Sequence, residues 1–346
     1  MVQLPMFLKR LFPSIYPQLD WIQVEISSYC NASCIYCPHS AFDANWQNRF
    51  LPLEAFRNLI PAFAKTRLVY LQGWGEPFLH PQFFEMLQIA KKAGCVVGTT
   101  TNGTLLNRET LAKMVTQGLD VIGFSLAGVD QKNDRIRKGT SIKKVLDCMA
   151  EIRRLKDRYR VDSPQIHIAY MLFRSGLEDL EKLPQFLSNT GAAQTVVSSL
   201  SYVISPAMEV ESVLASGEAE YLELKNRIFE VRKEALSKGS NVHFHLVSPV
   251  QNNFSCSENI PRAIVVGSDG SLSPCVMKQI PVQGENVYYI NGQICVQQNL
   301  SFGKIQQESL KTIWYCTQYR QFVREFRNGN TLVVCQNCLK KRIENF

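Results

Sequence analysis

The stretch that decides the fold is "EISSYCNASCIYCPHSAF", residues 25–42. It places Cys30, Cys34 and Cys37 within eight residues, directly after an apolar run and with no fourth cysteine nearby. Three thiolates can hold three irons of a [4Fe–4S] cluster and leave the fourth iron open to a substrate or cofactor. A structural zinc with His39 as fourth ligand, or chance clustering, are the alternatives. The spacing favours the iron–sulfur interpretation.

A regular alternation of strands and helices surrounds this cysteine loop. Strands are expected at 21–28, 67–73, 95–101, 119–126, 164–173 and 193–200, and helices at 51–65, 81–94, 107–117, 141–158 and 178–189. Gly94, Gly118 and Gly191 stand where three of these helices should end. Buried strands separated by helices pair in parallel through right-handed crossovers. The pattern predicts an α/β fold, a partial (β/α)6 TIM-like barrel with function at the carboxyl ends of its strands.

The pattern changes after residue 205. A helix is expected over about 217–238, ended by Gly239, followed by short strands, glycine turns such as the hairpin signal "SDGS" (268–271), and a helical tail. The expected organisation is an N-terminal extension (1–20), a core barrel (21–205), a helical linker (206–240) and a small α+β domain (241–346).

Composition limits the class of protein and its compartment. The chain has 346 residues, 45% hydrophobic and 20% charged, enough for a sizeable core. No apolar run approaches 18 residues and no export signal precedes the first strand, so we expect a cytoplasmic protein with no membrane partner. Eleven clustered cysteines then favour metal ligation over disulfides. The net charge of +8 fits solvated helix faces or an anionic partner, and nucleic acid is unlikely because no binding motif is present.

The CxxxCxxC loop with Tyr36 before its last cysteine resembles the radical S-adenosylmethionine (radical SAM) superfamily. The resemblance extends over residues 21–200, because related motifs end the following strands: "GWGEP" (73–77), "TTNG" (100–103), "FSLAGVD" (124–130) and then "RIRKG" (135–139). "RSG" (174–176) departs from the asparagine that many relatives carry after the fifth strand.

The resemblance implies which residues bind SAM. The backbone of Gly73, Trp74 and Gly75 and the carboxylate of Glu76 would engage the methionyl amino group. Ser125 would contact the ribose or the methionyl carboxylate, and the strand that contains Tyr170 would supply apolar contacts to adenine. The implied cofactor-binding set is Tyr36, Gly73, Trp74, Gly75, Glu76, Asn102, Ser125, Arg137 and Tyr170, with Cys30, Cys34 and Cys37 on the cluster.

The C-terminal cysteines resemble the SPASM/twitch extension of this superfamily. Thirteen residues separate Cys256 from Gly270, four separate Gly270 from Cys275, and Cys335 and Cys338 form a CxxC pair. The chain has no cysteine after Cys338, so the resemblance implies the twitch form: one auxiliary [4Fe–4S] cluster held by Cys256, Cys275, Cys335 and Cys338. A zinc ion on the same thiolates is the alternative. We expect the remaining cysteines to be buried small hydrophobes: Cys95, Cys148, Cys295 and Cys316.

Three functions are compatible with these motifs. The first is a maturase that cleaves SAM reductively to a 5′-deoxyadenosyl radical and abstracts a hydrogen atom from a peptide or protein, supplied with electrons by a flavodoxin- or ferredoxin-type reductant. The second is dehydrogenation or rearrangement of a small molecule in cofactor or antibiotic biosynthesis. The third is a non-catalytic metal-binding protein. The sequence identifies no catalytic acid or base; His167, His243 and His245 are weak candidates for substrate contacts.

Overall fold

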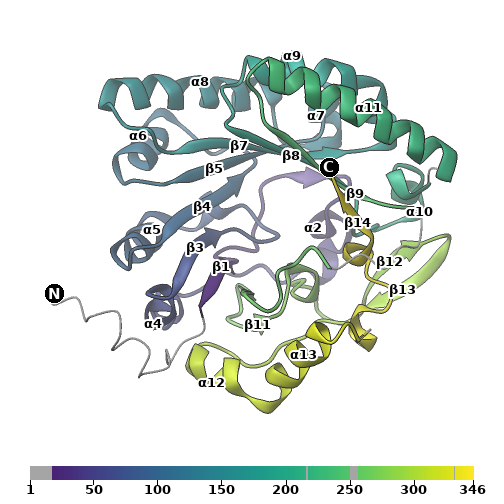
Figure 1. Cartoon of the computed structure of the whole chain (residues 1–346). Coiled ribbons are helices and arrows are strands. Elements are labelled where there is room, and N and C mark those ends of the chain that lie inside the picture. Colours follow the sequence, from purple (N-terminus) through teal and green to yellow (C-terminus); the bar gives the residue numbers. More distant parts are fainter. Residues whose placement is uncertain (1–17, 216, 250–255, 331) are drawn as a thin grey trace, which may run out of the picture.

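The computed structural model describes residues 18–215, 217–249, 256–330 and 332–346. A curved sheet in the order β11-β10-β1-β3-β4-β5-β7-β8-β9-β14 forms its centre (Figure 1). The six predicted strands are present and parallel: β1 (Leu19–Val24), β3 (Thr66–Leu71), β4 (Val96–Thr101), β5 (Val121–Leu126), β7 (Gln165–Leu172) and β8 (Gln194–Ser199). The predicted α/β barrel fold is confirmed.

Four later strands enlarge this sheet, two of them in parallel and two antiparallel. β9 (Val242–Val247) pairs in parallel with β8, and β10 (Ala263–Val266) pairs in parallel with β1. β11 (Leu272–Ser273) and β14 (Ile343–Asn345) add antiparallel edges. Both parallel additions follow the predicted boundary at residue 241, so the sheet is continuous across it. The division into domains stays a prediction, and residues 1–17 of the expected N-terminal extension lie outside the described residues.

Helices cover the convex face of the sheet (Figure 1). They are α3 (Leu53–Arg57), α4 (Ile60–Phe63), α5 (Phe83–Lys92), α6 (Arg108–Thr116), α8 (Ile142–Tyr159), α9 (Leu183–Ser188) and α11 (Glu218–Ser237). Alternate strand residues such as Ile122, Phe124 and Leu126 are fully buried and belong to one continuous apolar core with these helices. The other strand face points to the concave side, where polar residues are tolerated.

Two predicted helices are interrupted at prolines. The segment expected as one helix over 51–65 forms α3 and α4, and Pro61 lies in the first turn of α4. The segment over 178–189 is a 3-10 helix (Arg174–Lys182) followed by α9, with Pro184 in its first turn. Proline lacks the backbone N–H and is tolerated only in the first turn of a helix, so a new helix begins at each proline. The remaining predicted helices are confirmed to within a few residues.

The C-terminal region packs beside the open side of the barrel. It contains the hairpin of β12 (Asn286–Ile290) and β13 (Gln293–Gln297), followed by α12 (Leu310–Tyr315) and α13 (Thr317–Arg327). The "SDGS" turn joins β10 to β11, with Gly270 at φ +78°, so the predicted hairpin is confirmed. In the part of the chain that the structure describes, no helix has the length and apolar character needed to cross a bilayer.

Candidate active site and second cysteine cluster

The three N-terminal cysteines lie on the loop at the carboxyl end of β1. A short antiparallel pair, β2 (Ser33–Cys34) with β6 (Arg137–Lys138), sets Cys34 opposite Arg137. The backbone N–H of Cys37 donates to the carbonyl of Cys34 at 3.1 Å. The guanidinium of Arg137 donates to the hydroxyl of Tyr36. The loop is thus folded tightly, and residue 137 is brought to the cysteines.

One cavity of about 240 Å³ collects almost all of the predicted SAM residues. Most of its lining comes from the carboxyl ends of strands and the loops that follow them. The lining includes Cys30, Cys34, Cys37, Tyr36, Gly73, Trp74, Gly75, Glu76, Asn102, Ser125 and Arg137. Parallel strands bring these positions, which are spread over more than 100 residues of sequence, to one edge of the sheet.

Glu76 is fixed by the end of the neighbouring strand. Its side chain is 2% exposed, and its carboxylate accepts from the Thr101 hydroxyl at 2.7 Å and the Asn102 N–H at 2.8 Å. Burial raises the pKa of Glu76, and these hydrogen bonds oppose the rise. Asn102 in turn donates from Nδ2 to Asn31 Oδ1 at 2.9 Å, so the end of β4 also holds the cysteine loop. The "TTNG" motif at the end of β4 thus positions both Glu76 and the cysteine loop.

The glycines of "GWGEP" are required by a close backbone approach. A Cβ on Gly75 would lie 2.5 Å from the carbonyl oxygen of Tyr29 and 2.7 Å from the carbonyl carbon of Ser28. A Cβ on Gly73 would overlap the side chain of Glu25. The loop can therefore pack directly on residues 25–29 only because these positions lack side chains. The Glu76 N–H donates to the Tyr29 carbonyl at 2.7 Å across this contact.

The donor set fits a three-thiolate cluster with an anionic or zwitterionic ligand beside it. Arg137 is 6% exposed, and within the described residues its Nε has no hydrogen-bond partner. A buried guanidinium N–H without a partner is costly, and a carboxylate-bearing ligand in this cavity would supply one. Burial raises the pKa of Cys30 to about 11 and of Cys37 to about 12. Iron would have to displace these protons, as metals do in thiolate sites.

Among the described residues, no three Cys, His, Asp or Glu side chains stand close enough together to share a single metal ion. In a four-iron cluster each thiolate bonds a different iron, so its ligands need not converge on one point.

Tyr170 requires a correction. The register pairs it with Leu126, and both are buried in the core against the helices. The cavity is reached from β7 by the adjacent Met171 instead. Successive strand residues point to opposite faces, so a one-residue difference decides which side chain can meet a ligand. We therefore replace Tyr170 with Met171 in the proposed cofactor-binding set.

Sequence reasoning missed the far wall of the cavity. Tyr202 comes from the segment after β8, and Met277 comes from the C-terminal region, two residues after Cys275. The indole Nε1 of Trp74 donates to the carbonyl of Gln279 at 2.7 Å. No local motif marks these positions, because they reach the cavity only through the packing of the C-terminal region on the barrel.

The four C-terminal cysteines also share a cavity, of about 960 Å³. Its lining includes Cys256, Cys275, Cys335 and Cys338, together with the ion pair between Lys340 and Glu258 at 3.0 Å. Burial raises the pKa of Cys256 to about 12. The structure thus brings together the predicted auxiliary set.

Cys295 lines this second cavity as well, which corrects the expectation of a buried structural thiol. It lies on β13 directly opposite Tyr288 of β12, and its Sγ accepts a weak hydrogen bond from Asn337, inside the CxxC segment, at 3.9 Å. Its position in the sequence gave no signal, because the hairpin alone carries it to the other cysteines. The other three behave differently: Cys95 and Cys148 are buried, and the Sγ of Cys316 caps α13 by accepting from the Tyr319 N–H at 3.4 Å.

The three histidines that are candidates for substrate contacts lie on one face of the sheet. The register aligns Ser198 of β8 with Met171 of β7 on one side and with His245 of β9 on the other. His167 and His243 follow the same alternation, so all three imidazoles lie on the face that also carries Met171. None of them lines the two cavities described above.

Comparison with known proteins gives two family matches. The model of the radical SAM superfamily matches residues 24–187, and that of the SPASM iron–sulfur cluster-binding domain matches residues 256–339.

Individual relatives are similar over most of the chain. The tungsten-containing aldehyde ferredoxin oxidoreductase cofactor-modifying protein of Pyrococcus furiosus is 24% identical over 310 residues, 88% of this chain and 83% of the relative. SuiB of Streptococcus suis, solved with SAM, has a TM-score of 0.67 at 16% identity. The match covers 94% of this chain and 72% of the SuiB chain. The structure of anSMEcpe with SAM has a TM-score of 0.64 at 17% identity, and the match covers 92% of this chain and 86% of anSMEcpe.

The family matches cover both cysteine groups, and the structure brings each group together in its own cavity. The chain therefore carries a radical SAM domain and a C-terminal SPASM domain. These domains imply SAM, the [4Fe–4S] cluster that binds SAM, and auxiliary iron–sulfur as its cofactors.

Proposed function

We propose that this protein is a maturase that cleaves SAM reductively and abstracts a hydrogen atom from a peptide or protein substrate, which it modifies oxidatively. The observation that carries the proposal is the single cavity in which the three cysteines of the first loop meet the ends of β3, β4 and β5 and the buried Arg137. Such a site places a cofactor at the carboxyl ends of parallel strands.

Each part of the cavity has a proposed task. Cys30, Cys34 and Cys37 would hold three irons. Glu76 and the 73–75 backbone would hold the amino group of SAM, and Arg137 its carboxylate, through the unsatisfied Nε. When bound, the cluster and SAM together supply the electron and the 5′-deoxyadenosyl radical that the chemistry needs.

The remaining SAM contacts would orient the nucleoside half of the cofactor. Asn102, Ser125 and Met171 line the cavity at the ends of β4, β5 and β7. Orientation of the reacting groups and exclusion of water are the contributions that the protein makes to such chemistry.

The second cavity would hold one auxiliary [4Fe–4S] cluster. Cys256, Cys275, Cys335 and Cys338 give it four thiolates, so no iron would be left for substrate, and electron transfer is the proposed task. The two sites are adjacent in the fold: Cys275 lines one cavity and Met277 the other. An electron removed from a substrate radical would thus have an acceptor nearby. The first cluster would be reduced by an external flavodoxin- or ferredoxin-type protein.

A peptide substrate is supported by two proteins of similar fold that were solved with peptides. SuiB has been solved with its precursor peptide SuiA, and anSMEcpe with the Cp18Cys peptide. The identities of 15% and 17% establish likeness of fold only. A small-molecule substrate is the second candidate, because the relative from Pyrococcus furiosus is named for modification of a cofactor and matches 88% of this chain.

The test is formation of 5′-deoxyadenosine by anaerobically reconstituted protein with a chemical reductant and SAM. We expect a basal rate that rises when the correct substrate is added. Stimulation by peptide fractions from the native cell would support the maturase, and stimulation only by low-molecular-weight fractions would support the second candidate. No deoxyadenosine under any reductant would refute both. The variant Cys34→Ser, which removes one proposed iron ligand, is the negative control.

A further inference from the structure

Glu25, at the end of β1, is a carboxylate that the proposed chemistry does not use. Its side chain is 1% exposed. It lies five residues before Cys30 and does not line either cysteine cavity. A carboxylate buried to this degree costs free energy unless its oxygens are hydrogen bonded, so its partners show what it holds together.

The two oxygens of Glu25 bind two different parts of the protein. Oε1 accepts from the backbone N–H of Trp74 at 2.8 Å, within the "GWGEP" loop. Oε2 accepts from the N–H of Ser268 at 3.1 Å and from the Ser268 hydroxyl at 2.9 Å, in the turn between β10 and β11. One side chain therefore fixes the proposed SAM loop to the C-terminal region, more than 190 residues further along the chain.

The loop is packed on both sides of this contact. Gly73 lies so close to Glu25 that a Cβ there would come within 2.6 Å of Oε1. On its other side, the Trp74 indole donates to the Gln279 carbonyl at 2.7 Å, and the Gln279 amide donates to Asp269 at 3.2 Å. The loop backbone therefore lies between Glu25, which follows β1, and the residues that follow Ser268.

We propose that Glu25 is a positioning residue for SAM: by holding the Trp74 N–H against Ser268, it sets the 73–76 backbone in the geometry that binds the cofactor and makes SAM affinity depend on the docked C-terminal region. This inference rests on the proposed SAM site. It assigns Glu25 no contact with SAM.

The electrostatics of Glu25 supply a distinctive readout. Burial raises its pKa to about 7, opposed by the hydrogen bonds from Trp74 and Ser268, and Asp269 adds repulsion. Asp269 is itself paired with Lys304 at 3.1 Å. The carboxylate form accepts hydrogen bonds from all three donors. Protonation places an O–H among these donors and weakens the hydrogen bonds that join the loop to Ser268. SAM affinity should therefore rise as the pH increases through about 7.

The test is SAM binding to anaerobically reconstituted full-length protein, measured by equilibrium dialysis with radiolabelled SAM between about pH 6 and pH 9. We expect Glu25→Gln to keep its iron but to bind SAM about ten-fold more weakly above neutral pH, since the amide turns an N–H₂ toward one of the donors. It should also lack the step near pH 7 that the wild type shows. Titration of SAM's own amino group is common to both proteins and cancels in the comparison.

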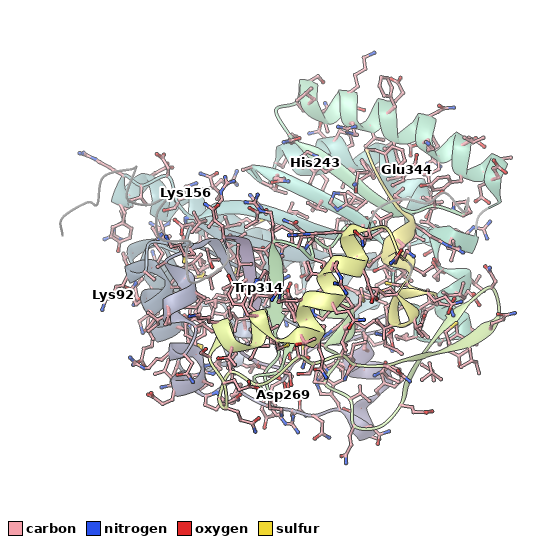
Figure 2. The ribbon with its side chains drawn as sticks, turned by 60° about the horizontal axis from the view of Figure 1, so that its bottom comes forward. Lys92, Lys156, His243, Asp269, Trp314 and Glu344 are labelled. Carbon is pink, nitrogen blue, oxygen red and sulfur yellow. The ribbon has the colours of Figure 1, made fainter. Side chains whose placement is uncertain are left out.

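Two further variants make the result specific. Ser268→Ala removes one donor from the C-terminal side, so SAM binding should weaken by about three-fold and the step should move to higher pH, because the carboxylate loses a hydrogen bond. Glu344→Gln is the matched control. Glu344 also ties the C-terminal segment to the barrel, through Lys225 at 2.5 Å, but it lies well away from Asp269 (Figure 2). It should bind SAM like the wild type.

The outcomes separate the two levels of the proposal. If the wild type binds no SAM, the proposed function is refuted and this inference falls with it. If the wild type binds SAM and Glu25→Gln shows the same affinity and the same pH profile, the inference alone is overturned. Should Glu25→Gln fail to fold, an unchanged affinity and pH step in Ser268→Ala would overturn it.

Discussion

Substitution of Gly75 by alanine is a sharp test of the way the proposed SAM loop is built. The new methyl group would stand 2.5 Å from the Tyr29 carbonyl oxygen and 2.7 Å from the Ser28 carbonyl carbon. These are backbone atoms of the segment that leads into the cysteine loop, so they cannot rotate away as a side-chain tip could. The two segments have to separate.

The expected magnitude follows from two contributions. Forcing a methyl group into a closely packed contact costs about 1–3 kcal/mol. Separation also weakens the 2.7 Å hydrogen bond from the Glu76 N–H to the Tyr29 carbonyl, a net loss of about 1 kcal/mol. We expect Gly75→Ala to lower the free energy of unfolding of the metal-free protein by about 2–4 kcal/mol.

The measurement is urea unfolding followed by circular dichroism, together with SAM dialysis against the reconstituted protein. SAM affinity should fall by at least about ten-fold, because Glu76 moves with the loop. Gly176→Ala is the matched control, since its methyl group would meet only Leu172 Cδ1 at 3.9 Å, an ordinary contact. An unfolding midpoint and SAM affinity equal to those of the wild type would show that the loop does not pack on residues 27–29 as described.

Further predictions concern the metal sites and their ligands. Wild-type protein should hold about eight irons; Cys275→Ser should lose about four and keep SAM binding, whereas Cys30→Ser should lose the other four and SAM binding with them. Cys295→Ser should still hold about eight irons, and a loss of four would make Cys295 a cluster ligand. Arg137→Lys should keep its iron but bind SAM about ten-fold or more weakly in dialysis, because an ammonium cannot replace the planar guanidinium; equal affinity would remove Arg137 from the site. Since burial raises the pKa of Cys30 to about 11, the thiolate fraction grows with pH, and iron uptake by the metal-free protein should accelerate between about pH 7 and pH 9; a flat profile would contradict the burial of these thiols.

Local patterns predicted the elements of the fold well. The alternation of strand-like apolar runs with helical segments, and the glycines that end helices, located the six strands and most helices to within a few residues. These signals depend on neighbours in the chain, so the sequence is sufficient to find them. The interruptions at Pro61 and Pro184 were missed, because the apolar spacing continues through both prolines and only the effect of proline on its own helix turn marks the break.

The candidate site was predictable where a motif follows a strand. It was not predictable where a residue's place depends on which face of the sheet its side chain lies on. Cys30, Glu76, Asn102 and Ser125 follow or end parallel strands, and that topology alone brings them to one cavity. The contribution of β7 was assigned to Tyr170, yet Met171 reaches the cavity. Periodicity gives two faces for each strand, and only the register with its neighbours decides which face is inside.

The sequence by itself determined the residue types and spacings that we propose bind iron and SAM, and the alternating order of strands and helices that builds a parallel sheet. Only the tertiary structure decided that β9 and β10 join that sheet, that Cys295 stands beside the CxxC pair, and that Glu25 binds Trp74 and Ser268 at once. Each of these depends on contacts between segments far apart in the chain. Such contacts are selected by burial and hydrogen bonding in the folded state, which leave no periodic or spacing signal at the positions involved.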